Sequence, residues 1–325
     1  MDRSGQKDNQ FRAAHLFSIF KYAILSWNKD NPWRLSAIVA YYAILSLPGL
    51  LVIIMNILSY IWGSEVVEGR VYDEIAATMG PSTAAGVESI FESARTDEQS
   101  LIAMLIGIGA LVFGATGVFY HLQISLNDIW EIEPDPKSSI IRYILDRLRS
   151  FGFVLVVAFL LLVSFVISAA LSALQDIIGG VFPDLYYYVA LVINIVISIG
   201  VVTLLFAMMF KYLPDARIRW KSVWIGALLT AVLFTIGKEL LAIYFGEASP
   251  ESVYGAAGSI IILLLWVSYS SLIFFFGAEF TWVYARWYGH GIRPKKYAKS
   301  VPKKDAELKE KTEKGSEDLK GSNNG

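Results

Sequence analysis

Cysteine is absent from the 325-residue sequence, and histidine occurs three times, as His15, His121 and His290. The absence of cysteine excludes disulfide bonds, thiolate nucleophiles and cysteine-based metal sites. No two histidines are spaced to share a metal ion, and the sequence has no HExxH motif, GxSxG elbow, phosphate-binding loop or dinucleotide fingerprint. These absences argue against an enzyme of the soluble type, and we expect no catalytic residues, no metal and no cofactor.

Charged residues are also scarce, at 18% of the chain, whereas hydrophobic residues make up 55%. The formal net charge of −1 gives no general attraction to nucleic acid, so we expect no nucleic-acid partner. The longest apolar run, residues 259–284, contains one ionisable side chain, Glu279. As a helix rising about 1.5 Å per residue, this run can cross a hydrocarbon layer about 30 Å thick. The sequence therefore predicts a membrane protein.

The apolar runs predict an all-α fold, a polytopic membrane bundle of six transmembrane helices. The expected spans are residues 36–62, 100–120, 151–174, 186–210, 223–245 and 259–284. They form a membrane domain at 36–286, between a leader at 1–35 and a charged, mostly disordered tail at 287–325. In the leader, residues 11–27 have the pattern of an amphipathic helix lying in the membrane interface. The acidic loop after the first span has the pattern of two short extracytoplasmic amphipathic helices.

The orientation of the bundle follows from the distribution of lysine and arginine. Basic residues gather in the leader, in the polar segment 121–150, in the loop 211–221 and in the tail. The two short loops on the opposite side contain none. Because cytoplasmic loops of membrane proteins carry the excess of basic residues, we expect both termini in the cytoplasm.

Polar side chains inside the predicted spans are the candidates for a substrate pocket, because such groups are costly in lipid. Asn56, Asn194, Lys238 and Glu239 fall in the outer part of the bilayer, and Glu279 lies nearer the cytoplasmic end. Neighbours in a helix point about 100° apart, so we expect Lys238 and Glu239 not to pair with each other. The structural alternative is that Lys238 extends toward the membrane surface, the asparagines bond across helices and Glu279 bonds to backbone.

Proline and glycine mark candidate hinges and close helix contacts. Pro48 lies within the first span, where a proline removes a backbone donor and kinks the helix. Gly114 and Gly117 lie in the second span, where small residues allow neighbouring helices to approach closely. Packing is the simpler role for these residues, and a gate or substrate path is the alternative.

Four segments together resemble one known family. They read AYYAILSLPGLL, NDIW, WKSVWIGALLTAVLFTIGKELLAIYF and YGAAGSIIILLLWVSYSSLIFFFGAEFTWVYAR, and they lie in this order between residues 27 and 289. Their order and spacing are similar to those of the YihY / virulence factor BrkB family. The resemblance implies a six-span protein of the bacterial cytoplasmic membrane whose biochemistry is not settled. The family's former label, ribonuclease BN, finds no support in these residues, which lack the metal cluster of such a nuclease.

The resemblance also implies a set of family positions in this chain, which we treat as candidates. They are Pro48, Asn127, Lys238, Tyr254, Gly255, Gly277, Ala278 and Glu279. Of these, Gly255 and Gly277 join Pro48, Gly114 and Gly117 as candidate hinge or packing positions.

Three functions are compatible with the sequence. The first is a transporter or translocator of a lipid or amphipathic envelope component, with membrane lipids as its partners. The alternative is a membrane scaffold that binds envelope proteins, or a second copy of itself, and has no transport activity. The ribonuclease is the third and has the least support.

Overall fold

The computed structural model describes residues 13–46, 69, 71–73, 75–76, 81, 83–88, 114, 117–134, 183–248, 258–288, 291–295 and 297–301. Within these ranges, the side chains at 13–16, 134, 183–194 and 246–248 are excluded. Of the predicted spans, 151–174 lies outside the described residues, as does most of 100–120 and the second half of 36–62. The six-helix count therefore stays a prediction.

Three long helices in the described part are apolar and long enough to cross a membrane. They are α7 (Pro183–Tyr212), α8 (Trp220–Ala248) and α10 (Gly258–Trp287), and each extends a predicted span by two or three residues at one or both ends. The side chains Phe206 and Phe210 of α7 pack on Phe274 of α10, with ring centroids 6.0 and 5.2 Å apart. Phe234 of α8 adds an edge contact to Phe206 at 5.7 Å. Aromatic packing thus joins the three helices.

A reciprocal pair of glycines and threonines brings α8 and α10 into close contact. A Cβ atom added at Gly226 would lie 1.8 Å from Thr281 Oγ1, and one added at Gly277 would lie 1.8 Å from Thr230 Oγ1. Each threonine is four residues after a glycine of its own helix and donates its hydroxyl to that glycine's carbonyl at 2.7 Å. The threonine hydroxyls are therefore satisfied without water, as a membrane interior requires.

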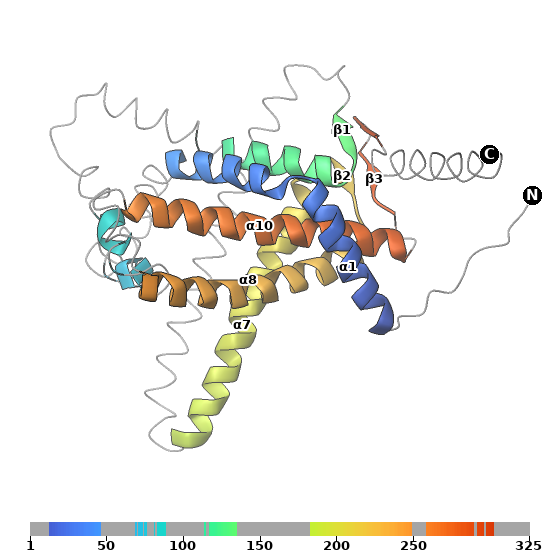
Figure 1. Cartoon of the computed structure of the whole chain (residues 1–325). Helices are drawn as coiled ribbons and strands as arrows, with labels where there is room; N and C mark the ends of the chain where they lie inside the picture. The colour runs from blue at the N-terminus through green and yellow to red at the C-terminus, as the bar shows by residue number, and fades with distance from the viewer. Residues whose placement is uncertain are drawn as a thin grey trace, which may run out of the picture.

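The N-terminal helix α1 (Ala13–Lys29) crosses the C-terminal half of α10 obliquely (Figure 1). Its buried residues Ile19 and Ala23 face α10, where Trp27 makes an edge contact with Phe276 at 6.0 Å. After α1 the chain turns at Asn31, whose φ is 51°, and a new helix occupies 32–46. The Asn31 carbonyl accepts the first backbone hydrogen bonds of that helix, from Arg34 and Leu35. The helix therefore begins four residues before the predicted span at 36–62.

A further helix runs antiparallel to the helix at 32–46, with glycines at the contact. A Cβ atom at Gly114 would lie 2.6 Å from the backbone nitrogen of Ser46, and one at Gly117 would meet the Tyr42 ring at 2.2 Å. This helix continues to residue 129, nine residues beyond the predicted span at 100–120. Its polar continuation remains helical because Leu122, Leu126 and Ile129 are buried against the other helices. Figure 1 shows α10 between this pair of helices and α8.

Four short strands, which the sequence does not predict, accompany the helices. β1 (Ile132–Pro134) pairs with β4 (Ala298–Ser300), and β2 (Ala216–Arg217) pairs with β3 (Arg293–Pro294), both antiparallel. In sequence, β3 and β4 follow the last long helix, and their partners precede α7 and α8. Figure 1 shows the strands together beside the C-terminal end of α10. The segment after α10 is therefore tied back to the bundle, at least as far as Val301.

Positions 71–73, 75–76 and 83–88 are helical and lie in the loop where the sequence predicts two short helices. A Cβ atom at Gly86 would lie 2.6 Å from the Ser259 side chain at the start of α10. The second of these segments thus sits against the end of α10 opposite the strands.

Candidate functional site

Glu279 is a fully buried carboxylic acid on the long apolar helix α10. It interacts with other groups of the protein, so it is not an isolated charge. It lies about seven residues past the midpoint of α10, or about 10 Å along the axis toward the C-terminal end. Its apolar neighbours Phe274, Phe275 and Val283 on the same helix are also buried.

The helical turn that carries Glu279 is fixed by side chains from two other helices. Trp130 donates its indole N–H to the Ala278 carbonyl at 3.0 Å, a contact between residues 148 positions apart. On the other side, Gly277 rests against Thr230 of α8. The Trp130 ring also packs near Phe210, with centroids 6.5 Å apart, and the Thr230 hydroxyl is bonded to its own helix. The backbone of the turn that carries Glu279 is therefore in contact with two other parts of the bundle.

Asn127 joins the helix at 117–129 to the loop between α7 and α8. Its amide donates to Asp215 Oδ2 at 3.1 Å, and its Oδ1 accepts from the Asp215 backbone N–H at 2.8 Å. Asn127 and Asp215 are both buried, so these two hydrogen bonds are protected from water. The Asp215 carbonyl in turn accepts from the Lys295 N–H at 2.9 Å, just after β3. One buried pair thus connects three segments that are distant in the sequence.

Glu131 makes a second connection at the same end of the bundle. Its backbone has a φ of 57°, which turns the chain from the helix into β1. Its carbonyl accepts from the Val301 N–H at 2.8 Å, and its carboxylate lies 3.7 Å from the Arg286 guanidinium. Arg286 also lies over the Trp282 ring, 4.7 Å from the ring centroid. The last turn of α10 and the segment after β4 are thereby attached to the same residue.

The predicted pocket residues do not all come together. The contacts Gly226–Thr281 and Thr230–Gly277 place Glu279 level with position 228 of α8. Lys238 lies ten residues further along α8, which corresponds to about 15 Å. Lys238 and Glu239 therefore belong to a different level of the bundle from Glu279.

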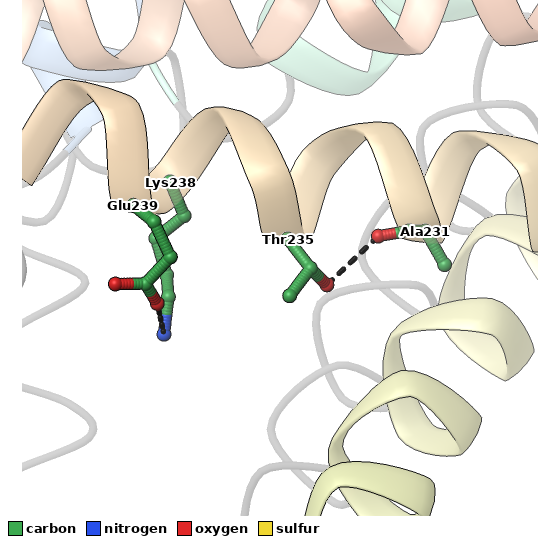
Figure 2. A network of polar contacts seen from close by, with 4 residues as sticks. All are labelled: Ala231, Thr235, Lys238 and Glu239. Atoms are coloured by element: carbon green, nitrogen blue, oxygen red, sulfur yellow. Dashed lines mark hydrogen bonds and ion pairs between the residues drawn. The ribbon is translucent and has the colours of Figure 1, made fainter.

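Lys238 and Glu239 form an ion pair with each other, with 3.5 Å between Lys238 Nζ and Glu239 Oε1. The expectation that the two side chains do not pair is wrong, because long flexible side chains bridge the 100° between neighbouring helix positions. Their side chains are 39% and 67% exposed. Figure 2 shows both projecting from α8 on the side away from α10, next to Thr235, whose hydroxyl bonds to the Ala231 carbonyl.

Some predicted positions cannot be placed as side chains. Asn56, Pro48 and Gly255 lie outside the described residues. Asn194 lies in α7, but its side chain is outside the described part. The predicted polar pocket that includes these residues stays a hypothesis.

Sequence reasoning missed Asp215 and the two threonines Thr230 and Thr281. Asp215 follows a proline within a basic loop, and such a carboxylate resembles many solvated ones, so its burial has no local signal. The threonines do have a signal, since each ends a Gly-x-x-x-Thr stretch in an apolar helix. A search of the described residues finds no group of three or more histidine, aspartate or glutamate side chains that could hold a metal ion.

Comparison with known proteins identifies relatives along most of the chain. Residues 23–301 match the family model described as Virulence factor BrkB, which confirms the resemblance seen in the sequence. UPF0761 membrane proteins of Pseudoalteromonas translucida and Vibrio vulnificus are 26% and 23% identical over 75% and 93% of this chain, and over 78% and 93% of their own. A UPF0761 membrane protein of Verminephrobacter eiseniae is 29% identical over 54% of this chain, which spans 40% of that longer protein. No solved structure matches significantly.

Proposed function

The chain belongs to the Virulence factor BrkB family of membrane proteins, and from that premise we propose that it translocates a lipid or another amphipathic envelope component. The proposal places it in the bacterial cytoplasmic membrane with both termini in the cytoplasm. In this proposal the protein is a transporter and carries out no enzymatic reaction. No observation in the described residues favours the ribonuclease.

The buried carboxyl group of Glu279 carries the proposal. An ionisable group inside a membrane helix is costly, and in membrane proteins such groups mark ion, proton or substrate pathways. Packing alone does not explain a glutamate here, because an apolar side chain would fill the same volume of α10 without the cost of burying a carboxyl group. The anchoring of its turn by Trp130 and Thr230 supports a site of fixed geometry. We propose that Glu279 takes up and releases a proton or cation as the bundle changes conformation.

The distribution of basic residues supports the proposed orientation. The end of the bundle with the strands carries the basic side chains of the described loops and helix ends: Lys211, Arg217, Arg219, Lys221, Arg286, Arg293, Lys295 and Lys299. The opposite ends of α8 and α10, in the described residues, have no lysine or arginine after Lys238 and before Arg286. By the positive-inside rule, the strand end faces the cytoplasm in this proposal.

Purified protein reconstituted in vesicles with fluorescent phospholipids tests the proposal. Wild-type protein is expected to accelerate lipid movement between leaflets over protein-free vesicles, and E279Q to reduce this acceleration at least about tenfold. E279D keeps an ionisable group and is expected to retain part of the activity. E133Q, which changes a half-exposed glutamate of β1, is the matched control and should behave as wild type.

Melting temperature and gel-filtration profile in detergent establish whether E279Q is folded. If lipid moved between leaflets no faster in vesicles with wild-type protein than in protein-free vesicles, the proposed translocation of lipid would be overturned. If E279Q were folded and as active as wild type, the proposed translocation would stand, but Glu279 would have no role in it.

The scaffold alternative is favoured by one observation, the pairing of β4 with β1. This pairing fixes the start of the charged tail on the bundle, where a partner could reach it. Capture of a specific envelope protein that depends on the tail, by a protein inactive in the vesicle assay, would support this alternative.

A further inference from the structure

Between Trp224 and Ile243, the side of α8 opposite α10 is apolar, with one charged interruption. Exposed apolar side chains recur every three or four residues: Trp224, Leu228, Val232, Ile236, Leu240 and Ile243. This spacing produces a continuous stripe on one side of the helix. Glu239 lies in the middle of the stripe, and Lys238 lies at its edge (Figure 2). The ion pair thus sits on the surface of a helix whose other exposed side chains suit lipid.

The position of the pair along α8 makes it costly there. Phe245, at the nearer end of the membrane-length segment Trp220–Phe245, is six residues from Glu239, or about 9 Å. Side chains of an α-helix tilt toward its N-terminus, so both side chains tilt away from this nearer end. The two side chains therefore cannot easily bring their charges to water by extending toward the membrane surface. An ion pair exposed to hydrocarbon is unfavourable unless polar groups come to it.

We propose that Lys238 and Glu239 form a binding site for the headgroup of a zwitterionic aminophospholipid on the lipid-facing side of α8. The lysine ammonium binds the phosphate, and the glutamate carboxylate accepts hydrogen bonds from the primary amine of the lipid. Their separation of 3.5 Å places the two charges close enough for one headgroup to contact both. The acyl chains lie along the apolar side chains that flank the pair, Ile236, Leu240 and Ile243.

The charges of the site select the ligand class. A purely anionic lipid offers a phosphate to Lys238 but no donor to the carboxylate of Glu239, which then has to share the lysine with that phosphate. A choline headgroup has a positive charge but no N–H to donate to that carboxylate. A primary amine next to a phosphate satisfies both protein groups. The site thereby indicates aminophospholipids as the substrate class of the proposed translocation. Its role in transport rests on that proposed function, whereas its binding of lipid can be measured without transport.

Equilibrium lipid binding tests the site directly. Purified protein in mixed lipid nanodiscs is offered phosphatidylethanolamine, phosphatidylcholine and phosphatidylglycerol, and the retained lipids are counted by native mass spectrometry. Wild type is expected to retain the ethanolamine lipid over the other two. E239Q should lower this preference about tenfold, since it loses the charge-assisted hydrogen bond. K238Q should weaken retention of both phosphatidylethanolamine and phosphatidylglycerol.

The ion pair between Lys299 and Glu133 provides a matched control outside the predicted spans. It has the same chemistry, 3.4 Å separation and comparable exposure, and the double variant E133Q/K299Q should keep the wild-type lipid preference. Lipid preference unchanged in both E239Q and K238Q would overturn the site. E279Q is expected to keep the preference, so a loss of translocation with retained binding would concern Glu279 alone.

A second copy of the chain is the competing occupant of this face. The natural sequence has no cysteine, so T235C introduces a unique thiol beside Glu239. In nanodiscs that hold two copies, the proposal expects no disulfide-linked dimer on oxidation. Efficient dimer formation together with no lipid preference would assign the face to self-association and overturn the proposal.

Discussion

At the scale of single residues, the described part of the bundle depends on a few long-range hydrogen bonds. The Asn127–Asp215 pair joins residues 88 positions apart, and the Trp130–Ala278 bond joins residues 148 apart. The sequence marks Asn127 through its family resemblance, but it cannot name Asp215 or Ala278 as the partners. Their meeting depends on how the helices pack. The same limit applies to Lys238 and Glu239, whose pairing depends on side-chain rotation and not on helix geometry.

The Trp130 hydrogen bond can be removed while most of the packing is kept. W130F retains an aromatic ring near Phe210 and loses the N–H that donates to Ala278. The expected loss of stability is about 1 kcal/mol, the usual net value of one buried hydrogen bond, and is measured as a lower melting temperature in detergent. W224F is the matched control, because Trp224 is exposed on α8 and should tolerate the change. Equal melting temperatures for W130F and wild type would show that the bond contributes nothing to stability.

At the scale of secondary-structure elements, apolar runs predict the long helices closely. α7, α8 and α10 match three predicted spans because about 20 consecutive apolar residues have few other stable forms. The polar half of the helix at 117–129 was missed, since its buried leucines and isoleucine alternate with Ser125, Asn127 and other polar residues. The strands were missed because two or three residues have too little pattern of their own. They exist through pairing with distant partners.

The contact between α8 and α10 depends on the absence of a side chain at Gly277. G277A adds a Cβ that would lie 1.8 Å from Thr230 Oγ1, and we expect a loss of about 1–3 kcal/mol from overpacking. Removing the hydroxyl in G277A/T230A should restore much of this loss, so the two changes are expected to be non-additive. Melting temperatures of the single and double variants measure the coupling.

Gly200 of α7 is the control for helix propensity in this experiment. Nothing lies within 4 Å of a Cβ atom at Gly200, so G200A is expected to be neutral or slightly stabilising. If G277A and G200A changed the melting temperature alike, the close contact of α8 with α10 would not be the cause.

At the scale of the whole molecule, the long-range side-chain hydrogen bonds and the strands of the described residues lie at one end of the bundle, whereas Lys238 and Glu239 lie toward the other. The strand end joins four parts of the chain: the helix at 117–129, the loop around Asp215, the end of α10 and the segment through Val301. A bundle fixed at one end can change its helix spacing mainly at the other. This arrangement suits the proposed translocation, because the proposed lipid site on α8 lies toward the end where the described residues make fewer long-range hydrogen bonds.

The junction between β4 and Glu131 tests whether this end behaves as one unit. V301P removes the backbone N–H that donates to the Glu131 carbonyl, whereas V301A keeps it and serves as the control. We expect V301P, but not V301A, to increase hydrogen exchange at the Ile132, Glu133 and Asp215 amides, because β3 and β4 are connected through Lys295. Exchange within α8 around Gly237 should stay at the wild-type rate. If exchange rose at β1 alone and left the Asp215 amide protected, the two sheets would be independent, and the strand end would not act as a single clamp on the bundle.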